Sequence, residues 1–184
     1  MGSEGTTTMI IYFLRHASAG ERVSNPKKDE RRALDPVGIQ QCGYIGRALN
    51  ALDVQVSLII SSPLKRATQT ASLVGNELGY EGKLVLDDAL RPGAPFADFR
   101  KMVDKYARHE AIMVVGHNPS LSEFVGRAIS ENGCEANLEL KKAGVAKIET
   151  QRNSAELQWC LPPKIVRVLH ASSAESSRPK TSRK

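Results

Sequence analysis

The chain is poor in cysteine and histidine and contains no long apolar run. Its three cysteines, Cys42, Cys134 and Cys160, form no close-spaced pair, which is typical of reduced thiols in a cytoplasmic protein. None of the four histidines lies at a metal-ligand spacing from a cysteine, so no metal site is predicted. No apolar run approaches the roughly 18 residues that a membrane-spanning helix needs, so we expect no membrane association.

Two phosphate-handling motifs are also missing, namely a glycine-rich P-loop and a carboxylate cluster that would bind magnesium. The remaining composition, 41% hydrophobic and 25% charged over 184 residues, is that of one globular domain. We place this domain at residues 9–170.

The two ends of the chain differ in composition from this domain. Residues 1–8 have neither a basic start nor an apolar stretch, so they do not read as a secretory signal and are predicted to be a disordered extension. Residues 171–184 contain four basic residues and one acidic residue, and so contribute +3 of the net charge of +6. We predict a disordered basic tail. The tail and the net charge alone suggest nucleic-acid binding, but a solvated basic end explains them without such a partner.

Hydrophobic periodicity predicts alternating strands and helices. Short, largely β-branched apolar runs indicate strands at 9–14, 56–60, 83–86 and 111–115. Apolar stripes at helical spacing indicate helices at 36–51, 62–78, 96–108 and 118–129. Residues 144–150 and 156–161 indicate a terminal hairpin. We therefore predict an α/β fold, a three-layer α/β/α sandwich whose mostly parallel central sheet carries an antiparallel element.

Three of the helices are predicted to begin with a capping residue followed by proline. The capping residues are Asp35, Ser62 and Asn118, each directly before a proline. Gly79 is predicted to end the second helix as the glycine after its C-cap.

Basic side chains follow the strands where the functional edge of such a sheet is expected. His16 and His117 come directly after the first and fourth strands, and Arg15 precedes His16. Arg66 lies about one turn into the helix after the second strand. Ligands bind beyond the carboxyl ends of parallel strands, so these four side chains are expected to meet there. A single histidine at a strand end is often a hydrogen-bonded core residue, and a single arginine is usually solvated, so the prediction of phosphoryl chemistry depends on all four together.

Three segments carry a resemblance to a known family. Arg15-His16, the segment 62–70 (Ser-Pro-Leu-Lys-Arg-Ala-Thr-Gln-Thr) and the segment 116–118 (Gly-His-Asn) resemble the signatures of the histidine phosphatase superfamily, whose fold is phosphoglycerate-mutase-like. Within it, the chain is most similar to the SixA-type phosphohistidine phosphatases, and segment 32–38 resembles that group. The resemblance covers residues 9–161.

The resemblance implies a role for each of the four residues. His16 would be the nucleophile that forms a covalent phosphohistidine. Arg15 and Arg66 would bind the phosphoryl oxygens, and His117 would donate to one of them. The two guanidinium groups would supply the positive charge, so neither a metal nor another cofactor is expected.

The expected substrate follows from the segment around Asp87 and Asp88. Related enzymes take a general acid from this region, so the two aspartates are candidate acids, although a solvated turn explains them as well. A phosphorylated imidazole departs as a neutral group when its other nitrogen is protonated, and so has less need of an acid. The 50 residues between Arg66 and His117 leave little chain for a lid over the pocket, and an open pocket would admit a phosphoryl group carried by a protein.

We therefore predict a phosphatase that hydrolyses phosphohistidine in proteins, such as phosphotransfer domains. Mutase activity is not expected, because segment 17–21 (Ala-Ser-Ala-Gly-Glu) lacks the residues that mutases carry there. The alternatives are a broad-specificity phosphomonoesterase acting on small phosphate esters, with Asp87 or Asp88 as acid, and a catalytically weak phosphoprotein-binding module. The basic loop 22–32 would either steer an acidic partner or be solvated. His109 and His170 have no motif around them and are expected at the surface.

Overall fold

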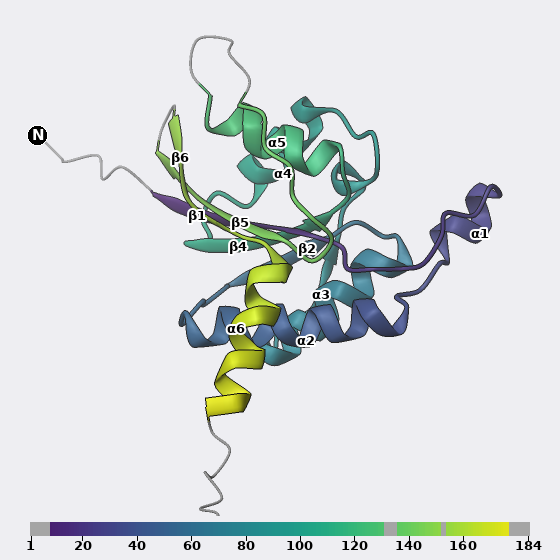
Figure 1. The fold of residues 1–184 in the computed structure, drawn as a ribbon. Coiled ribbons are helices and arrows are strands. Elements are labelled where there is room, and N and C mark those ends of the chain that lie inside the picture. Colours follow the sequence, from purple (N-terminus) through teal and green to yellow (C-terminus); the bar gives the residue numbers. More distant parts are fainter. Residues whose placement is uncertain (1–7, 131–135, 152–153, 177–184) are drawn as a thin grey trace, which may run out of the picture.

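The computed structural model describes residues 8–130, 136–151 and 154–176, and it is built around a six-stranded sheet (Figure 1). The strand order is β3-β2-β4-β1-β5-β6. The strands are β1 (Met9–Arg15), β2 (Leu58–Ser61), β3 (Val85–Leu86), β4 (Ala111–Gly116), β5 (Val145–Gln151) and β6 (Ser154–Leu161). The first four strands pair in parallel, whereas β5 pairs antiparallel with both β1 and β6. The mostly parallel sheet and its antiparallel hairpin are thus confirmed.

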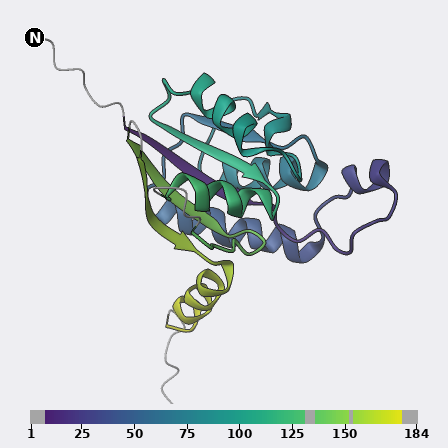
Figure 2. The same cartoon turned by 90° about the horizontal axis from the view of Figure 1, so that it is seen from above.

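Helices cover both faces of the sheet (Figures 1 and 2). One face carries α2 (Pro36–Ala51), α3 (Lys65–Glu77) and α6 (Pro163–Ser176), and the other carries α4 (Phe96–Lys105) and α5 (Ser120–Ala128). Side chains alternate along a strand, so Tyr12 and Leu14 of β1 pack against the first group, and Ile11 and Phe13 against the second. The sequence-based prediction of three layers is confirmed.

The predicted helix starts are correct in one case and wrong in two. Asp35 caps α2, its carboxylate accepting from the Gly38 amide at 2.7 Å, and Gly79 follows α3 with a φ of 67°. Ser62 does not cap α3, which begins at Lys65, because its hydroxyl contacts His117 instead. Asn118 likewise does not cap α5, because its side chain contacts the Ser122 hydroxyl and the Leu140 carbonyl.

Two helices were not predicted. The segment expected to be a polar loop contains α1 (Pro26–Glu30), capped by the Asn25 side chain. Asn25-Pro26 is the same cap-plus-proline signal that marks α2, so the sequence did contain it. The other helix, α6, runs past the predicted tail boundary at Ala171 to Ser176. Residues 1–7 of the predicted extension and 177–184 of the predicted tail lie outside the described residues.

Two predicted elements are shorter than expected. The strand predicted at 83–86 is only β3, and the helix predicted at 96–108 ends with α4 at Lys105. A 3₁₀ turn, η1 (Asp88–Leu90), follows β3. Within the described ranges, no helix is both long and apolar enough to cross a membrane.

Candidate active site

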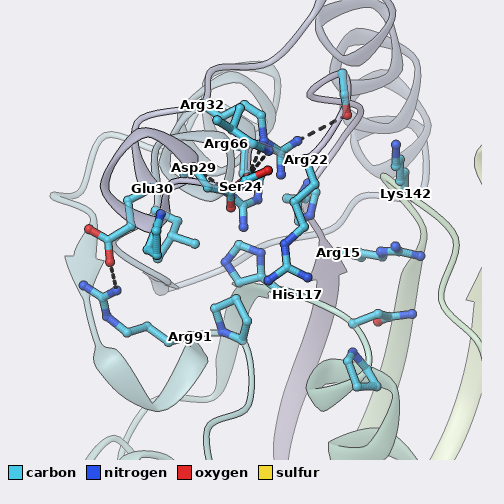
Figure 3. A pocket seen from close by; sticks show the side chains of 18 residues that line it. Arg15, Arg22, Ser24, Asp29, Glu30, Arg32, Arg66, Arg91, His117 and Lys142 are labelled. Atoms are coloured by element: carbon cyan, nitrogen blue, oxygen red, sulfur yellow. Dashed lines mark hydrogen bonds and ion pairs between the residues drawn. The ribbon is translucent and has the colours of Figure 1, made fainter.

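A cavity of about 640 Å³ lies beyond the carboxyl ends of β1 and β4 and beside the start of α3 (Figure 3). All four residues singled out in the sequence line it, namely Arg15, His16, Arg66 and His117. The segment between β1 and α2 forms one of its sides, contributing Gly20, Arg22, Val23, Ser24, Pro26, Asp29, Glu30 and Arg32. The structure therefore brings the predicted residues together and adds a side that the sequence did not reveal.

The backbone fixes the orientation of the His16 ring. His16 follows β1 directly, is 8% exposed, and its backbone amide donates to the Gly116 carbonyl at 3.0 Å. Its Nδ1 lies 2.7 Å from the Ala17 carbonyl oxygen. Because a carbonyl only accepts, Nδ1 carries the proton of the neutral ring, and Nε2 keeps a lone pair at the other end. Nε2 forms no hydrogen bond with any described residue.

Burial keeps the His16 imidazole neutral. It lowers the pKa of His16 from 6.5 to about 4, with further lowering by the positive charges of Arg66 and Arg15. These effects outweigh the hydrogen bond to Ala17, which acts in the opposite direction. At neutral pH the ring therefore has the lone pair that a nucleophile requires.

His117 is held from the opposite side. It is 3% exposed, and its Nε2 lies 2.9 Å from the Ser62 hydroxyl. Its Nδ1 is buried and has no hydrogen-bond partner among the described residues. The centroids of the His16 and His117 rings are 4.9 Å apart. Burial lowers the pKa of His117 to about 2, with further lowering by the protonated form of His16 and by Arg66, so at neutral pH this ring is neutral as well.

Each of the two arginines donates a hydrogen bond to a backbone carbonyl through one nitrogen. Arg15 Nη1 donates to the Leu140 carbonyl at 2.8 Å, and Arg66 Nη1 donates to the Asp29 carbonyl at 2.9 Å. Arg66 Nη1 also lies 3.2 Å from the Asp29 carboxylate. The Nε atoms of both arginines are buried and have no partner among the described residues. Together with Nδ1 of His117, they are the buried side-chain nitrogens left without a hydrogen bond in the described part of the chain.

The loop after His16 is fixed by side chains from two helices. Thr70 of α3 accepts from the Ala17 amide at 3.1 Å and donates to the Arg66 carbonyl at 2.7 Å. The Asp35 carboxylate accepts from the Ser18 hydroxyl at 2.7 Å. Gly38 approaches this loop so closely that a Cβ there would lie 2.0 Å from the Ser18 carbonyl oxygen. The nucleophile candidate thus lies on a rigid support.

The carboxylates of the cavity are already paired. Asp29 contacts Arg66 and also Arg32, whose Nε lies 2.9 Å from its Oδ1. Although burial acts in the opposite direction, the hydrogen bonds from Arg32 and the Val23 amide lower the pKa of Asp29. Glu30 lies 2.7 Å from Arg91, as the dashed contact in Figure 3 marks. Because its pKa is lowered, the Asp29 carboxylate is a poor proton donor.

The two aspartates proposed as acids lie outside the cavity. Asp87 accepts from the Ala89 amide at 2.9 Å and caps η1. Asp88 pairs with Arg91, and its side chain is 80% exposed. Neither residue lines the cavity. Their positions fit the alternative interpretation, a solvated turn.

The remaining histidines are also elsewhere. His109 contacts the Ser57 hydroxyl at 3.1 Å, and the His170 ring lies 5.4 Å from that of Tyr44. In the described part of the chain, no group of three or more His, Cys, Asp or Glu side chains could hold a metal ion.

Comparison with known proteins defines the class. Residues 11–92 match the Histidine phosphatase superfamily (branch 1). An uncharacterized protein of Picosynechococcus is 31% identical over 140 residues, which cover 74% of this chain and 82% of that protein. The chain belongs to the histidine phosphatase superfamily, branch 1, and is a phosphatase of that superfamily.

Two further similarities are to phosphatases whose substrates are named. The solved structure of the protein histidine phosphatase SixA complexed with tungstate has a TM-score of 0.74 at 18% identity, covering 86% of this chain and 99% of that one. At that identity the likeness shows the fold, which is therefore phosphoglycerate-mutase-like as predicted. The mitochondrial serine/threonine-protein phosphatase Pgam5 of Drosophila persimilis is 36% identical over 86 residues. That match covers 46% of this chain and only 29% of the Drosophila protein.

Proposed function

We propose that the protein hydrolyses phosphohistidine in other proteins, through a covalent phosphohistidine formed on His16. The observation that carries the proposal is the set of three buried, unpartnered nitrogens on Arg15, Arg66 and His117. A buried donor without an acceptor costs roughly 1–3 kcal/mol, so such atoms gather where a ligand supplies the acceptor. A phosphoryl group, with its three non-bridging oxygens, matches three donors.

The first step is attack by Nε2 of His16 on phosphorus. The new P–N bond forms as the bond to the leaving group breaks, and the electron pair of that bond departs with the leaving group. Arg15 and Arg66 bind the phosphoryl oxygens as charge shifts between them, and the Nδ1–H of His117 donates to an oxygen. The Nδ1–H of His16 continues to donate to the Ala17 carbonyl, which stabilises the positive charge on the ring.

The second step releases phosphate. Water attacks phosphorus, its O–P bond forms, and the P–N bond to His16 breaks with the electron pair returning to Nε2. One water proton passes to solvent through the phosphate. Because Nδ1 keeps its own proton, His16 leaves as a neutral imidazole ready for another turnover.

The pairing of the cavity carboxylates with arginines favours phosphohistidine over phosphate esters as the substrate. An alkoxide leaving group benefits from a general acid, an effect of about 10²–10⁴-fold. Within the described residues, the cavity carboxylates, Asp29 and Glu30, are both paired with arginines. A phosphorylated imidazole protonated on its other nitrogen departs neutral and needs no such acid. The fold likeness to SixA supports the same substrate.

The test compares leaving groups on one protein. The purified chain is assayed with a histidine-phosphorylated phosphotransfer domain, a phosphoserine peptide and p-nitrophenyl phosphate. We expect kcat/KM to be at least about 10²-fold higher for the phosphohistidine protein than for the phosphoserine peptide. Equal or reversed values would exclude the phosphohistidine proposal and leave the phosphomonoesterase alternative. Binding of the phosphorylated domain without phosphate release would indicate the binding-module alternative.

A second candidate function is hydrolysis of phosphoserine or phosphothreonine in proteins. The match to the serine/threonine-protein phosphatase Pgam5 favours it, over less than half of this chain. The same panel decides, because this function requires efficient turnover of the phosphoserine peptide. In either case we propose a cytoplasmic location, supported by the sparse, unpaired cysteines.

A further inference from the structure

A buried serine lies behind His117, at the ring nitrogen opposite the unpartnered one. Ser62 directly follows β2 and is fully buried. Its hydroxyl oxygen lies 2.9 Å from Nε2 of His117, although the two residues are 55 positions apart in the chain. Ser62 does not line the cavity, so it has no place in direct substrate contact.

The surroundings of the hydroxyl decide the direction of this hydrogen bond. A serine hydroxyl has one proton to donate and two lone pairs. The Leu64 amide donates to the Ser62 oxygen at 3.4 Å, which uses one lone pair. Among the described residues, Nε2 of His117 is the acceptor within reach of the hydroxyl proton. The reverse direction would leave a buried hydroxyl proton without an acceptor, which is costly.

We propose that Ser62 is a positioning residue: its hydroxyl donates to Nε2 of His117 and thereby fixes the ring as the tautomer with its proton on Nδ1. A neutral imidazole has one donor and one acceptor nitrogen, so whichever atom contacts Ser62 determines what the other offers. With the proton on Nδ1, His117 presents a donor to a phosphoryl oxygen. With the proton on Nε2, it would present a lone pair that repels the same oxygen. The benefit to substrate follows from the proposed function, whereas the tautomer itself does not depend on it.

The neighbouring serine provides a matched control. Ser61 is also fully buried at the end of β2, and its hydroxyl donates to the Ser62 carbonyl at 2.9 Å. No hydrogen bond joins its side chain to either histidine. Ser61→Ala therefore removes a buried hydroxyl from the same place in the fold without touching the His117 ring.

The direct test is the position of the proton. The full chain is labelled with ¹⁵N-histidine, and the His117 signals are assigned by their loss in His117→Asn among the four histidines of the sequence. Without any ligand at pH 7, we expect Nδ1 of His117 to be protonated in the wild type and in Ser61→Ala. In Ser62→Ala we expect the proton to shift, wholly or in part, to Nε2. A wild-type ring protonated on Nε2 would overturn the proposal, and that spectrum needs no variant of Ser62 to fold.

The second measurement is the affinity for orthovanadate, a tetrahedral oxyanion. Loss of one hydrogen bond to a charged group predicts binding at least about tenfold weaker in Ser62→Ala. Ser61→Ala should bind as the wild type does, and Ser62→Thr should recover most of the loss because it restores the hydroxyl. Equal losses in Ser61→Ala and Ser62→Ala would mean a merely structural role and overturn the proposal.

The position of the His117 proton and the assay of phosphohistidine hydrolysis together separate this inference from the proposed function. If the tautomer shifts as expected but no phosphohistidine is hydrolysed, the role of Ser62 stands and the proposed substrate fails. If phosphohistidine is hydrolysed but His117 carries its proton on Nε2, the proposed function stands and the role of Ser62 fails.

Discussion

The two histidines of the cavity have the same side chain but use different ring nitrogens for their hydrogen bonds to the protein. His16 donates through Nδ1 to the carbonyl of Ala17, whereas His117 contacts the Ser62 hydroxyl through Nε2. The free nitrogen is therefore Nε2 in His16 and Nδ1 in His117. A lone pair suits a nucleophile and an N–H suits an oxyanion, so the partner of each ring, and not the residue type, assigns its role.

The largest expected effect is the loss of the lone pair of His16. His16→Ala should reduce phosphohistidine hydrolysis to background, a fall of at least about 10³-fold, because among the described residues His16 alone presents a free imidazole lone pair to the cavity. The wild type incubated with ³²P-labelled substrate and quenched should carry acid-labile, base-stable label, and the variant should carry none. Equal labelling of both proteins would remove His16 from its proposed role.

Replacing His117 should distinguish a donor from a nucleophile. His117→Ala should lower kcat/KM by about 10²–10³-fold, the usual cost of one oxyanion donor. His117→Asn should recover about tenfold of this loss, because the asparagine amide nitrogen lies where Nδ1 lies on a histidine ring. No corresponding recovery is expected for His16→Asn, since an amide nitrogen has no lone pair for attack.

The titration of the two rings should also differ. Both pKa values are lowered, but that of His16 to about 4 and that of His117 to about 2. Of these two rings, only His16 should therefore gain a proton as the pH is lowered from 7 to 3, with a midpoint near 4 in its ¹⁵N shifts. The unfolded chain binds these protons near pH 6.5, so the free energy of unfolding should fall as the pH drops below that value.

The contrasting outcome for the titration is a midpoint near 6.5 for His16. It would mean that the ring is solvated and charged below neutral pH. The control is His16→Asn, whose loss of the His16 signal assigns that signal in the spectra of the wild type.

The smallest effect is expected outside the cavity. Asp88→Asn should change kcat/KM for phosphohistidine by less than about twofold, because this carboxylate pairs with Arg91 and is largely exposed. The matched variant Asp87→Asn should behave alike. A loss of about tenfold or more for p-nitrophenyl phosphate in either variant would assign that aspartate the role of acid for esters.

Local signals in the sequence predicted most of the fold. The apolar run before His16 and the run before His117 are fully local, so both strands and the meeting of the two histidines could be inferred. The roles of Ser62 and Asn118 could not. Their capping pattern is local, but their actual partners lie far along the chain, and the tertiary contacts replace the caps.

The side of the cavity formed by α1 was missed for a related reason. A run of mixed charges looks solvated, and only the fold reveals that Asp29 reaches Arg66, 37 positions further along the chain. The cap-plus-proline signal at Asn25-Pro26 could have located the helix, but not its contact.

The pairing of Asp29 and Glu30, the acidic residues at the end of α1, affects the association rate of an anionic partner. Asp29 and Glu30 are neutralised by arginines of the cavity, whereas the basic side chains of the same segment are exposed and pair with no acidic group among the described residues: Arg22, Lys27, Lys28 and Arg31. The excess of exposed positive charge in segment 22–32 predicts a positive field at the mouth of the cavity. Such a field accelerates diffusional encounter with an acidic protein surface. Added salt slows the encounter, because it shortens the range of the field to about 10 Å at 0.1 M.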